Sequence, residues 1–134
     1  MTSNDLNWAT PGTRVAVLHT DAGRGTGVEL RTVKHATATQ VVLDNDTRWR
    51  VRDGKQLGKT SDTWSTVGAR VRRVDDPEVV ATRAGIRLRN LGRTIGTTLT
   101  GKRTQVTDVD AALALLAEVE QAIAATRKRI EALR

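Results

Sequence analysis

The sequence has no cysteine, no phenylalanine and no tyrosine, and only two histidines and two prolines among its 134 residues. The absence of cysteine excludes disulfide scaffolds, thiolate metal sites and cysteine nucleophiles. His19 and His35 are too few for most histidine-based metal sites, so we predict no catalytic residue, no metal site and no cofactor. Trp8, Trp49 and Trp64 are the only aromatic side chains, so the core should be small and mainly aliphatic.

Long apolar runs are also missing from the sequence. No segment approaches the roughly 18 apolar residues that a membrane-spanning helix needs, and the N-terminus lacks the apolar centre of a signal peptide. We therefore expect no membrane partner and a cytoplasmic location. A hydrophobic content of 38% and a charged content of 28% are typical of a folded globular chain.

The positive charge is unevenly distributed along the chain, whose formal net charge is +7. Residues 10–75 have twelve lysines and arginines against seven acids, and residues 76–107 have six against two. Residues 108–134 have four against five. A negatively charged partner should therefore contact residues 10–107.

Alternating apolar residues over residues 10–75 predict short strands. The expected inward positions are Val15 and Val17, Val28 and Leu30, Val41 and Leu43, Trp49 and Val51, and Val67, Ala69 and Val71. In the second of these strands, Glu29 and Arg31 should point outward, and a β-bulge near Thr32 would bring Val33 inward. Five short strands with frequent turns predict a small β-barrel over residues 10–75 rather than a sandwich.

Residues 76–134 predict a helical region, which makes the fold class α+β. Asp75 and Asp76 followed by Pro77 form a typical helix start, and the apolar spacing predicts a helix over about residues 77–94. A loop is expected over about residues 96–106. A second helix, over about residues 108–133, should start at Thr107 or Asp108, with Thr107 and Asp110 in capping-box spacing.

The second predicted helix has a heptad pattern typical of a coiled coil. Its expected interface residues are Leu116, Val119, Ile123, Ile130 and Leu133. The pattern indicates packing against another helix, which could belong to the same chain or to a second copy. We favour a homo-oligomer that forms through this helix.

Arginines occupy the predicted outer face of two strands, at Arg48, Arg50 and Arg52 and again at Arg70 and Arg72. If the two strands lie close together, these side chains form a basic patch that can bind several phosphates of DNA or RNA. The alternative is a solvated polar face with no ligand. Trp49 points inward by the same alternation, so we expect a core residue rather than a base-stacking platform.

The first predicted helix has four arginines in two i,i+4 pairs, at Arg83, Arg87, Arg89 and Arg93. Like-charge pairs at this spacing are mildly destabilising unless an anion compensates them. Lys102 and Arg103 add two more positive charges in the loop that follows. These six residues complete the candidate nucleic-acid site.

Two other motifs have simpler interpretations. The glycine-rich segment at residues 23–27 has no Gly-Lys-Ser/Thr and no following helix, so a hairpin loop is favoured over a phosphate-binding loop. His19, Asp21 and His35 could approach one another across two strands, but no nucleophile or third ligand accompanies them. An enzyme is therefore not expected.

One part of the chain resembles a known group of proteins. The residues are His19…Gly23-Arg24-Gly25…Thr37-Ala38-Thr39-Gln40-Val41-Val42…Arg48-Trp49-Arg50…Asp53-Gly54…Leu57-Gly58. The pattern resembles small, mostly uncharacterised proteins of actinobacterial phages, in which an SH3-like barrel precedes one or two helices. The resemblance covers about residues 10–80. It implies a five-stranded SH3-like barrel, a phage-encoded protein in the host bacterial cytoplasm and no catalytic residues.

Two functional hypotheses follow from these observations. The first is a basic module that binds DNA or RNA through the arginines of the barrel and of the first helix. The second is an oligomeric protein–protein interaction module that docks on a host protein and changes its activity. Salt distinguishes the two, because phosphate binding weakens steeply with ionic strength whereas an apolar docking surface tolerates salt.

Overall fold

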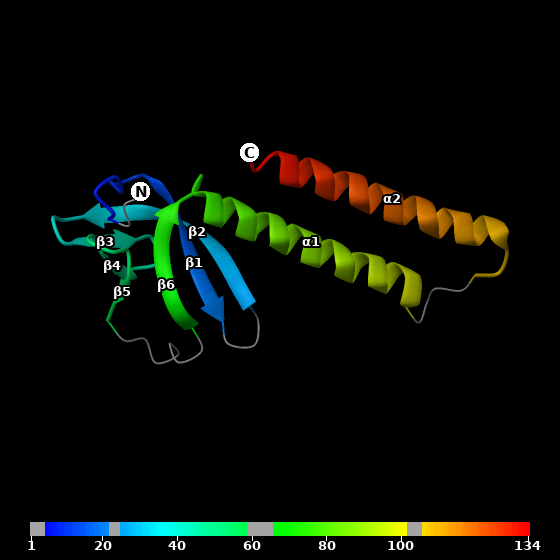
Figure 1. Ribbon diagram of the computed structural model, residues 1–134, viewed down its shortest axis with the longest axis horizontal. Coiled ribbons are helices and arrows are strands. Elements are labelled where there is room, and N and C mark those ends of the chain that lie inside the picture. Colours follow the sequence, from blue (N-terminus) through cyan, green and yellow to red (C-terminus); the bar gives the residue numbers. More distant parts are fainter. Residues whose placement is uncertain (1–4, 22–24, 59–65, 102–105) are drawn as a thin grey trace. The chain divides into compact units, whose positions relative to one another are not determined.

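The computed structural model describes residues 5–21, 25–58, 66–101 and 106–134 (Figure 1). It confirms an α+β chain, in which an antiparallel sheet is followed by two helices. The strands are β1 (Arg14–Asp21), β2 (Gly25–Ala36), β3 (Gln40–Leu43), β4 (Arg48–Arg50), β5 (Gln56–Leu57) and β6 (Thr66–Arg73), and the helices are α1 (Pro77–Thr100) and α2 (Val109–Glu131). The chain divides into two compact units, Met1–Thr82 and Arg83–Arg134, and α1 belongs to both.

The sheet is open and has six strands in the order β5-β4-β3-β2-β1-β6. The expected barrel had five strands. The additional strand is β5, which has only two residues and pairs with β4 through Arg48–Leu57 and Trp49–Gln56. So short a strand has no alternation of its own, which is why the sequence pattern did not indicate it.

The core lies on one face of the sheet, here called the inner face. The inward positions expected for β1, β3, β4 and the turn after β4 are confirmed, because Val15, Val17, Val41, Leu43, Trp49 and Val51 are all buried in one cluster. Val71 of β6 belongs to the same cluster. The side chain of Val67 and all of Trp64 lie outside the described residues.

A segment before the first strand completes this core. Leu6 is 2% exposed and its backbone N–H donates to the carbonyl of Val51 at 2.6 Å. The indole of Trp8 packs against the core and lies beneath the Arg73 guanidinium, whose central carbon is 4.6 Å from the ring centroid. This cation–π contact ties the segment to the end of β6.

The two faces of β2 are the reverse of the prediction. Arg31 and Glu29 pair directly with the inward Val15 and Val17, so they are on the inner face, and Val28 and Leu30 are on the outer one. Val33 is 2% exposed and shares the face of Arg31 without a bulge at Thr32. The register shift between β2 and β3 falls later, between Val33 and His35.

The apolar outer positions of β2 have a physical reason in β1. Ala16 and Leu18 are 0% and 8% exposed, so β1 is buried on both faces. Val28 and Leu30 pair with Leu18 and Ala16 and continue this apolar outer strip. A strand that is buried on both faces has no polar side that would show its orientation. For the same reason, the apolar residues of β2 beside the outer face of β1 suggested an inward position for Val28 and Leu30.

Helix α1 begins as predicted and ends later than predicted. The Asp76 side chain accepts from the N–H of Glu78 at 2.9 Å, which confirms an aspartate cap ahead of Pro77. The helix continues to Thr100, through the first half of the expected loop. Thr94 and Thr100 donate their hydroxyls to the carbonyls of Asn90 and Gly96, four residues earlier, so they are accommodated within the helix.

Helix α2 agrees with the expected range, and the structure selects the second of its two expected starts in place of the capping box. Asp108, not Thr107, is the N-cap residue, and its carboxylate accepts from the N–H of Ala111 at 2.8 Å. Within the described part of the chain, neither helix has an apolar stretch that could cross a bilayer.

Candidate nucleic-acid interface

The two arginine-bearing strands are brought together where the ends of the sheet approach each other. Lys55, just before β5, forms an isolated antiparallel bridge with Arg70 of β6. The N–H of Val71 donates to the carbonyl of Gly54 at 3.0 Å, and the N–H of Arg50 donates to that of Lys55 at 2.8 Å. Gly54 makes this close approach possible, since it is buried and has a positive φ of 71°.

The cations at this junction share the outer face. Trp49 points into the core and pairs with Gln56, so Arg48, Arg50 and Lys55 point the other way. Arg70 and Arg72 pair with Leu18 and Ala16 of the outer strip. We call Arg48, Lys55, Arg70 and Arg72 the basic face.

Lys55 is the member of the basic face that the sequence analysis missed. It follows the turn Arg52-Asp53-Gly54, where no strand was expected, and its exposed side chain is directly opposite the half-buried Arg70. Like charges directly opposite each other in a sheet repel, at a cost of up to about 1 kcal/mol. An anion bound between them would remove that repulsion.

Arg50 is already neutralised within the chain. Its Nε and Nη2 atoms donate to the two carboxylate oxygens of Asp53 at 3.0 Å and 2.5 Å. This pair lowers the pKa of Asp53 to about 2 and raises the pKa of Arg50, because the carboxylate and the guanidinium stabilise each other's charge. Arg50 is therefore held in place beside the basic face and contributes little net charge to it.

The expectation that Arg48, Arg50 and Arg52 share the outer face of one strand is only partly correct. Strand β4 ends at Arg50, so Arg52 is not in the strand but in the turn that follows, where it is exposed. Arg48 is also exposed, and Arg70 and Arg72 are half-buried. Among the described residues, neither Arg48 nor Lys55 forms an ion pair, although Lys55 is close enough to the Asp53 carboxylate to help lower its pKa.

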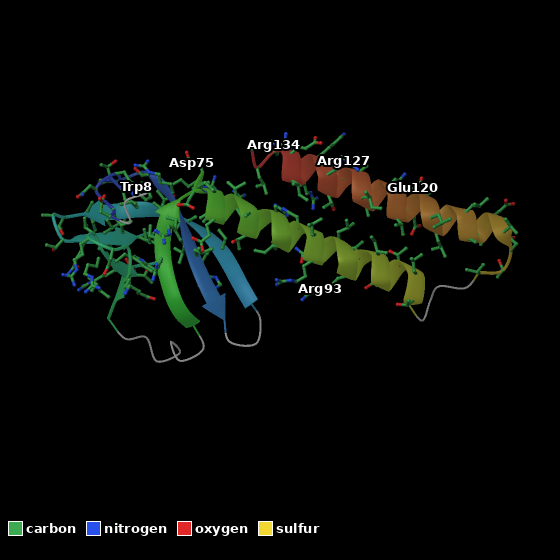
Figure 2. The ribbon with its side chains drawn as sticks, viewed as in Figure 1. Trp8, Asp75, Arg93, Glu120, Arg127 and Arg134 are labelled. Carbon is green, nitrogen blue, oxygen red and sulfur yellow. The ribbon has the colours of Figure 1, made fainter. Side chains whose placement is uncertain are left out.

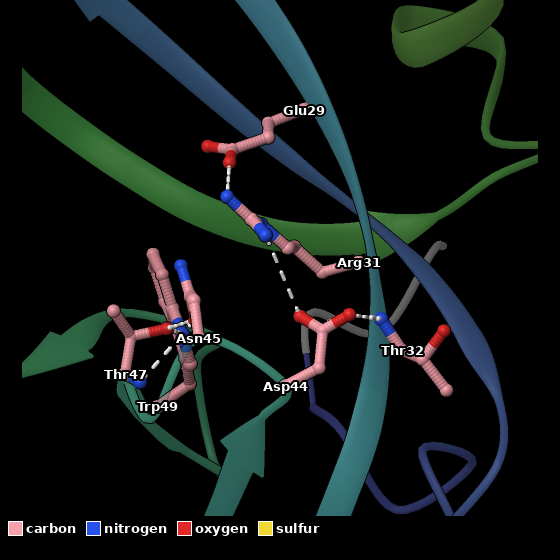
Figure 3. Close-up of polar contacts among 7 residues, drawn as sticks. All are labelled: Glu29, Arg31, Thr32, Asp44, Asn45, Thr47 and Trp49. Atoms are coloured by element: carbon pink, nitrogen blue, oxygen red, sulfur yellow. Dashed lines mark hydrogen bonds and ion pairs between the residues drawn. The ribbon is translucent and has the colours of Figure 1, made fainter.

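Other cations of the sheet have acidic partners in the chain. Lys34 Nζ is 3.0 Å from Asp46 Oδ1. Arg31 pairs with Glu29, and its Nη1 atom is 3.8 Å from Asp44 Oδ1 (Figure 3). Lys34 and Arg31 are therefore partly neutralised within the chain.

The arginines of α1 do not form one face. At 100° per residue, Arg83 and Arg87 point in one direction and Arg89 and Arg93 point roughly 120° away from it. Arg83 and Arg87 are half-buried, whereas Arg89 and Arg93 are exposed. Lys102 and Arg103 lie outside the described residues. The four arginines of α1 therefore do not form a single site.

The residues expected at the oligomer interface differ in exposure within the helical hairpin. Val119, Ile130 and Leu133 are half-buried, whereas Leu116 and Ile123 are 52% and 39% exposed. Two different stripes of α2 are therefore apolar.

A polar hollow of about 200 Å³ lies on the inner face. It is lined by Val17, His19, Glu29, Asn45, Thr47, Trp49, Gln56 and Ala69. The Trp49 indole N–H donates to Thr47 Oγ1 at 2.8 Å, and this hydroxyl donates to Asn45 Oδ1 at 2.6 Å (Figure 3). Trp49 is 3% exposed, which makes it unsuitable as a base-stacking platform.

The glycine-rich segment lies partly outside the described residues. Gly23 and Arg24 lie outside the described residues, and the described part of the chain has no cluster of three or more potential metal ligands. Comparisons of the chain with protein-family models, with curated proteins and with solved structures give no match.

Proposed function

We propose that the chain is a non-enzymatic module that binds the phosphate backbone of DNA or RNA through the basic face. The observation that carries the proposal is the Lys55–Arg70 bridge, which puts the cations of β4 and β6 on one continuous outer surface. A phosphate site formed by the arginines of both strands requires that the two strands lie close together. The sequence alone does not show whether they do.

The chemistry of the basic face favours phosphate over base recognition. Arginine and lysine at these positions can contact successive phosphates, and Trp49, the tryptophan of β4, is buried in the core. Trp49 is therefore not exposed for stacking on a base, and the contacts of the basic face itself favour weak sequence preference. Four phosphate contacts would give a salt slope of about −3.6 on duplex DNA and about −2.8 on single strands.

The arginines of α1 extend the proposal to a second contact region. Arg89 and Arg93 are exposed, and Arg83 and Arg87 line a different side of the helix. Either pair, with Lys102 and Arg103, could bind additional phosphates of a longer nucleic acid. These contacts would add to the salt slope without changing the role of the sheet.

The finer description of the sheet belongs to the same proposal. We infer an SH3-like barrel, supported by the bridge between the strands at the two ends of the sheet. A phage gene acting in a bacterial cytoplasm is the origin that the resemblance implies. The second candidate function, docking on a host protein, is supported by the exposed apolar residues Leu113, Leu116 and Ile123 of α2.

Fluorescence-anisotropy titration of labelled DNA and RNA at low and moderate salt tests the proposal. The variant Arg48→Glu/Arg70→Glu should abolish binding, because it reverses two charges on the basic face. The matched control is Lys128→Glu/Arg129→Glu, which makes the same charge change on α2 away from Ile123 and Arg127. Equal losses in both variants, or no binding by the natural chain at low salt, would contradict the proposal.

A further inference from the structure

The helical hairpin does not bury an apolar core of its own. No side chain of residues 83–101 or 106–134 is buried. Leu88, Leu99, Val109, Leu113 and Leu116 are between 45% and 74% exposed. Two helices that cover so little apolar surface are not a stable unit in water, so this surface needs a partner.

The exposed apolar residues gather on one side of the hairpin. A groove between α1 and α2 is lined by Leu88, Leu91, Ile123, Thr126, Arg127, Ile130, Glu131 and Arg134. A second groove, on the other side, is lined by Arg87, Asn90, Leu91, Thr94, Ala122, Ala125, Thr126 and Arg129. Leu88 and Ile123 therefore belong to the first side, and the second side is made of alanine and polar residues.

Helical spacing extends the first side along both helices. Leu99 is eleven residues from Leu88, and Leu116 is seven from Ile123, so both keep the same direction at about 3.6 residues per turn. Val109 is a further seven residues from Leu116. We call Leu88, Leu99, Val109, Leu116 and Ile123 the open face.

The charges of the hairpin are separated by sign. Residues 83–93 of α1 include Arg83, Arg87, Arg89 and Arg93 and no acid. They run beside the end of α2 and the residues that follow it, which have Arg127, Lys128, Arg129 and Arg134 against Glu131 (Figures 1 and 2). The first half of α2 has Asp108, Asp110, Glu118 and Glu120 and no cation. One end of the hairpin is strongly positive and the other end is negative.

This separation of charge favours one kind of partner and one orientation of its helices. We propose that the open face binds the open face of a second copy of the chain, with the two α2 helices antiparallel and the two-fold axis near Ile123. The acidic half of each α2 then faces the basic half of the other. The alternative four-helix arrangement, with α1 over the α2 of the second copy, would stack the two positive ends and is disfavoured.

The positions of two charges on the open face fit the same axis. Glu120 and Arg127 lie on either side of Ile123, three and four residues away, and both are exposed (Figure 2). They are seven residues apart, or roughly 10 Å along one helix, so they are too distant to pair within a chain. An antiparallel copy centred on Ile123 brings Glu120 level with Thr126 of the second copy, one residue from Arg127 and within reach of its guanidinium, and symmetry makes two such pairs.

The heptad supplies a second, independent match. With the axis at Ile123, Leu116 is level with Ile130 of the second copy, because both are seven residues from the centre. The same symmetry makes Ile123 its own neighbour. Apolar layers and opposite charges therefore coincide in one register, as a stable antiparallel pair requires.

Light scattering over a range of concentrations tests the proposal on the full chain. The natural chain should have twice its 14.6 kDa mass. Glu120→Lys and Arg127→Glu should each shift the dimer–monomer midpoint by about tenfold or more, since each creates two like-charge contacts. The double variant Glu120→Lys/Arg127→Glu should be dimeric again. Glu118→Lys makes the same charge change on the opposite side of α2 and should leave the dimer intact.

A mixing experiment distinguishes the interface from a folding defect. Equal amounts of Glu120→Lys and Arg127→Glu chains should form a heterodimer, because each charge then meets its opposite. The absence of native cysteine allows a further measurement, in which an Ile123→Cys chain should oxidise to a covalent dimer and an Ala125→Cys chain should not.

Three outcomes would overturn the inference. A monomeric natural chain at all concentrations would mean that another segment or another protein covers the open face. A dimer that Glu120→Lys leaves unchanged, or a double variant that stays monomeric, would exclude the antiparallel register. None of these outcomes tests whether the basic face binds nucleic acid. The dimer proposal and the nucleic-acid proposal can therefore be contradicted independently of each other.

Discussion

Lys55 and Arg70 lie directly opposite each other in the isolated bridge between the β5 side of the sheet and β6. Two cations are thus direct cross-strand neighbours, and within the described residues Lys55 has no ion pair, only the longer-range attraction of the Asp53 carboxylate. The arrangement is unfavourable in the free protein and becomes favourable when an anion binds. This relationship is the physical basis of the proposed phosphate site.

Lys55→Gln and Lys34→Gln remove the same charge from two different places, and we expect different effects on binding. Lys55 belongs to the basic face, so its loss should reduce the salt slope by about one phosphate. Lys34 is paired with Asp46, and its loss should leave the slope unchanged. Anisotropy titrations at several salt concentrations give both slopes. Equal salt slopes for the two variants would show that Lys55 does not contact the nucleic acid.

Asp53→Asn should strengthen nucleic-acid binding. The substitution removes a negative charge beside the basic face and releases Arg50, which Asp53 now holds through two hydrogen bonds. Affinity and salt slope should both rise, by about one phosphate contact. Asp46→Asn, which releases Lys34 instead, is the matched control. Weaker binding by Asp53→Asn would show that the pair serves to position the face.

The same carboxylate should influence stability in acid. The pKa of Asp53 is lowered to about 2, below its usual 3.8. Its contribution to the free energy of unfolding is therefore complete above pH 3.8 and is lost as the pH falls towards 2. Urea unfolding of the natural chain and of Asp53→Asn should converge over this range. NMR titration of the carboxyl group gives the pKa directly, and a value near 3.8 would contradict the contact.

Gly27→Ala should destabilise the sheet through one contact. A Cβ atom at residue 27 would be 2.6 Å from Cε1 of His19, which lies across from it in β1. Such overpacking typically costs about 1–3 kcal/mol. His19→Ala removes the obstructing ring, so the double variant should regain most of the stability lost by Gly27→Ala. Additive losses in urea unfolding would mean that the ring is not the obstacle.

Asp108→Ala and Thr107→Ala separate the two possible caps of α2. Loss of the Asp108 carboxylate leaves the N–H of Ala111 without its acceptor and should cost about 1 kcal/mol. Thr107→Ala should have almost no effect. Circular dichroism during urea unfolding, at a fixed protein concentration, compares the two. A larger loss from Thr107→Ala would support the capping box expected from the sequence.

Local patterns were sufficient for much of the fold. Alternation identified the buried residues of β3 and β4, such as Leu43 and Trp49, because each of these strands is buried on one face only. The aspartate and proline at the start of α1 identified its first turn, since capping is determined by neighbouring residues. These features depend on a few adjacent positions.

Features that depend on distant residues could not be predicted. The faces of β2 were assigned in reverse because Val28 and Leu30 pack on the outer side, next to the doubly buried β1. The threonines near the end of α1 suggested that the helix ends before residue 96. In the structure, the hydroxyls of Thr94 and Thr100 donate to backbone carbonyls within the helix. The proximity of Lys55 and Arg70 depends on the path of the fourteen residues between them, so no local pattern indicates it.

NMR mapping of the interface tests the central claim most directly. A short single-stranded oligonucleotide is added to the ¹⁵N-labelled protein at low salt, and the backbone and side-chain N–H signals are followed. We expect the largest changes at Arg48, Lys55, Arg70 and Arg72, with little change at Lys34. Changes confined to the helices, or no changes at all, would contradict a phosphate site on the sheet.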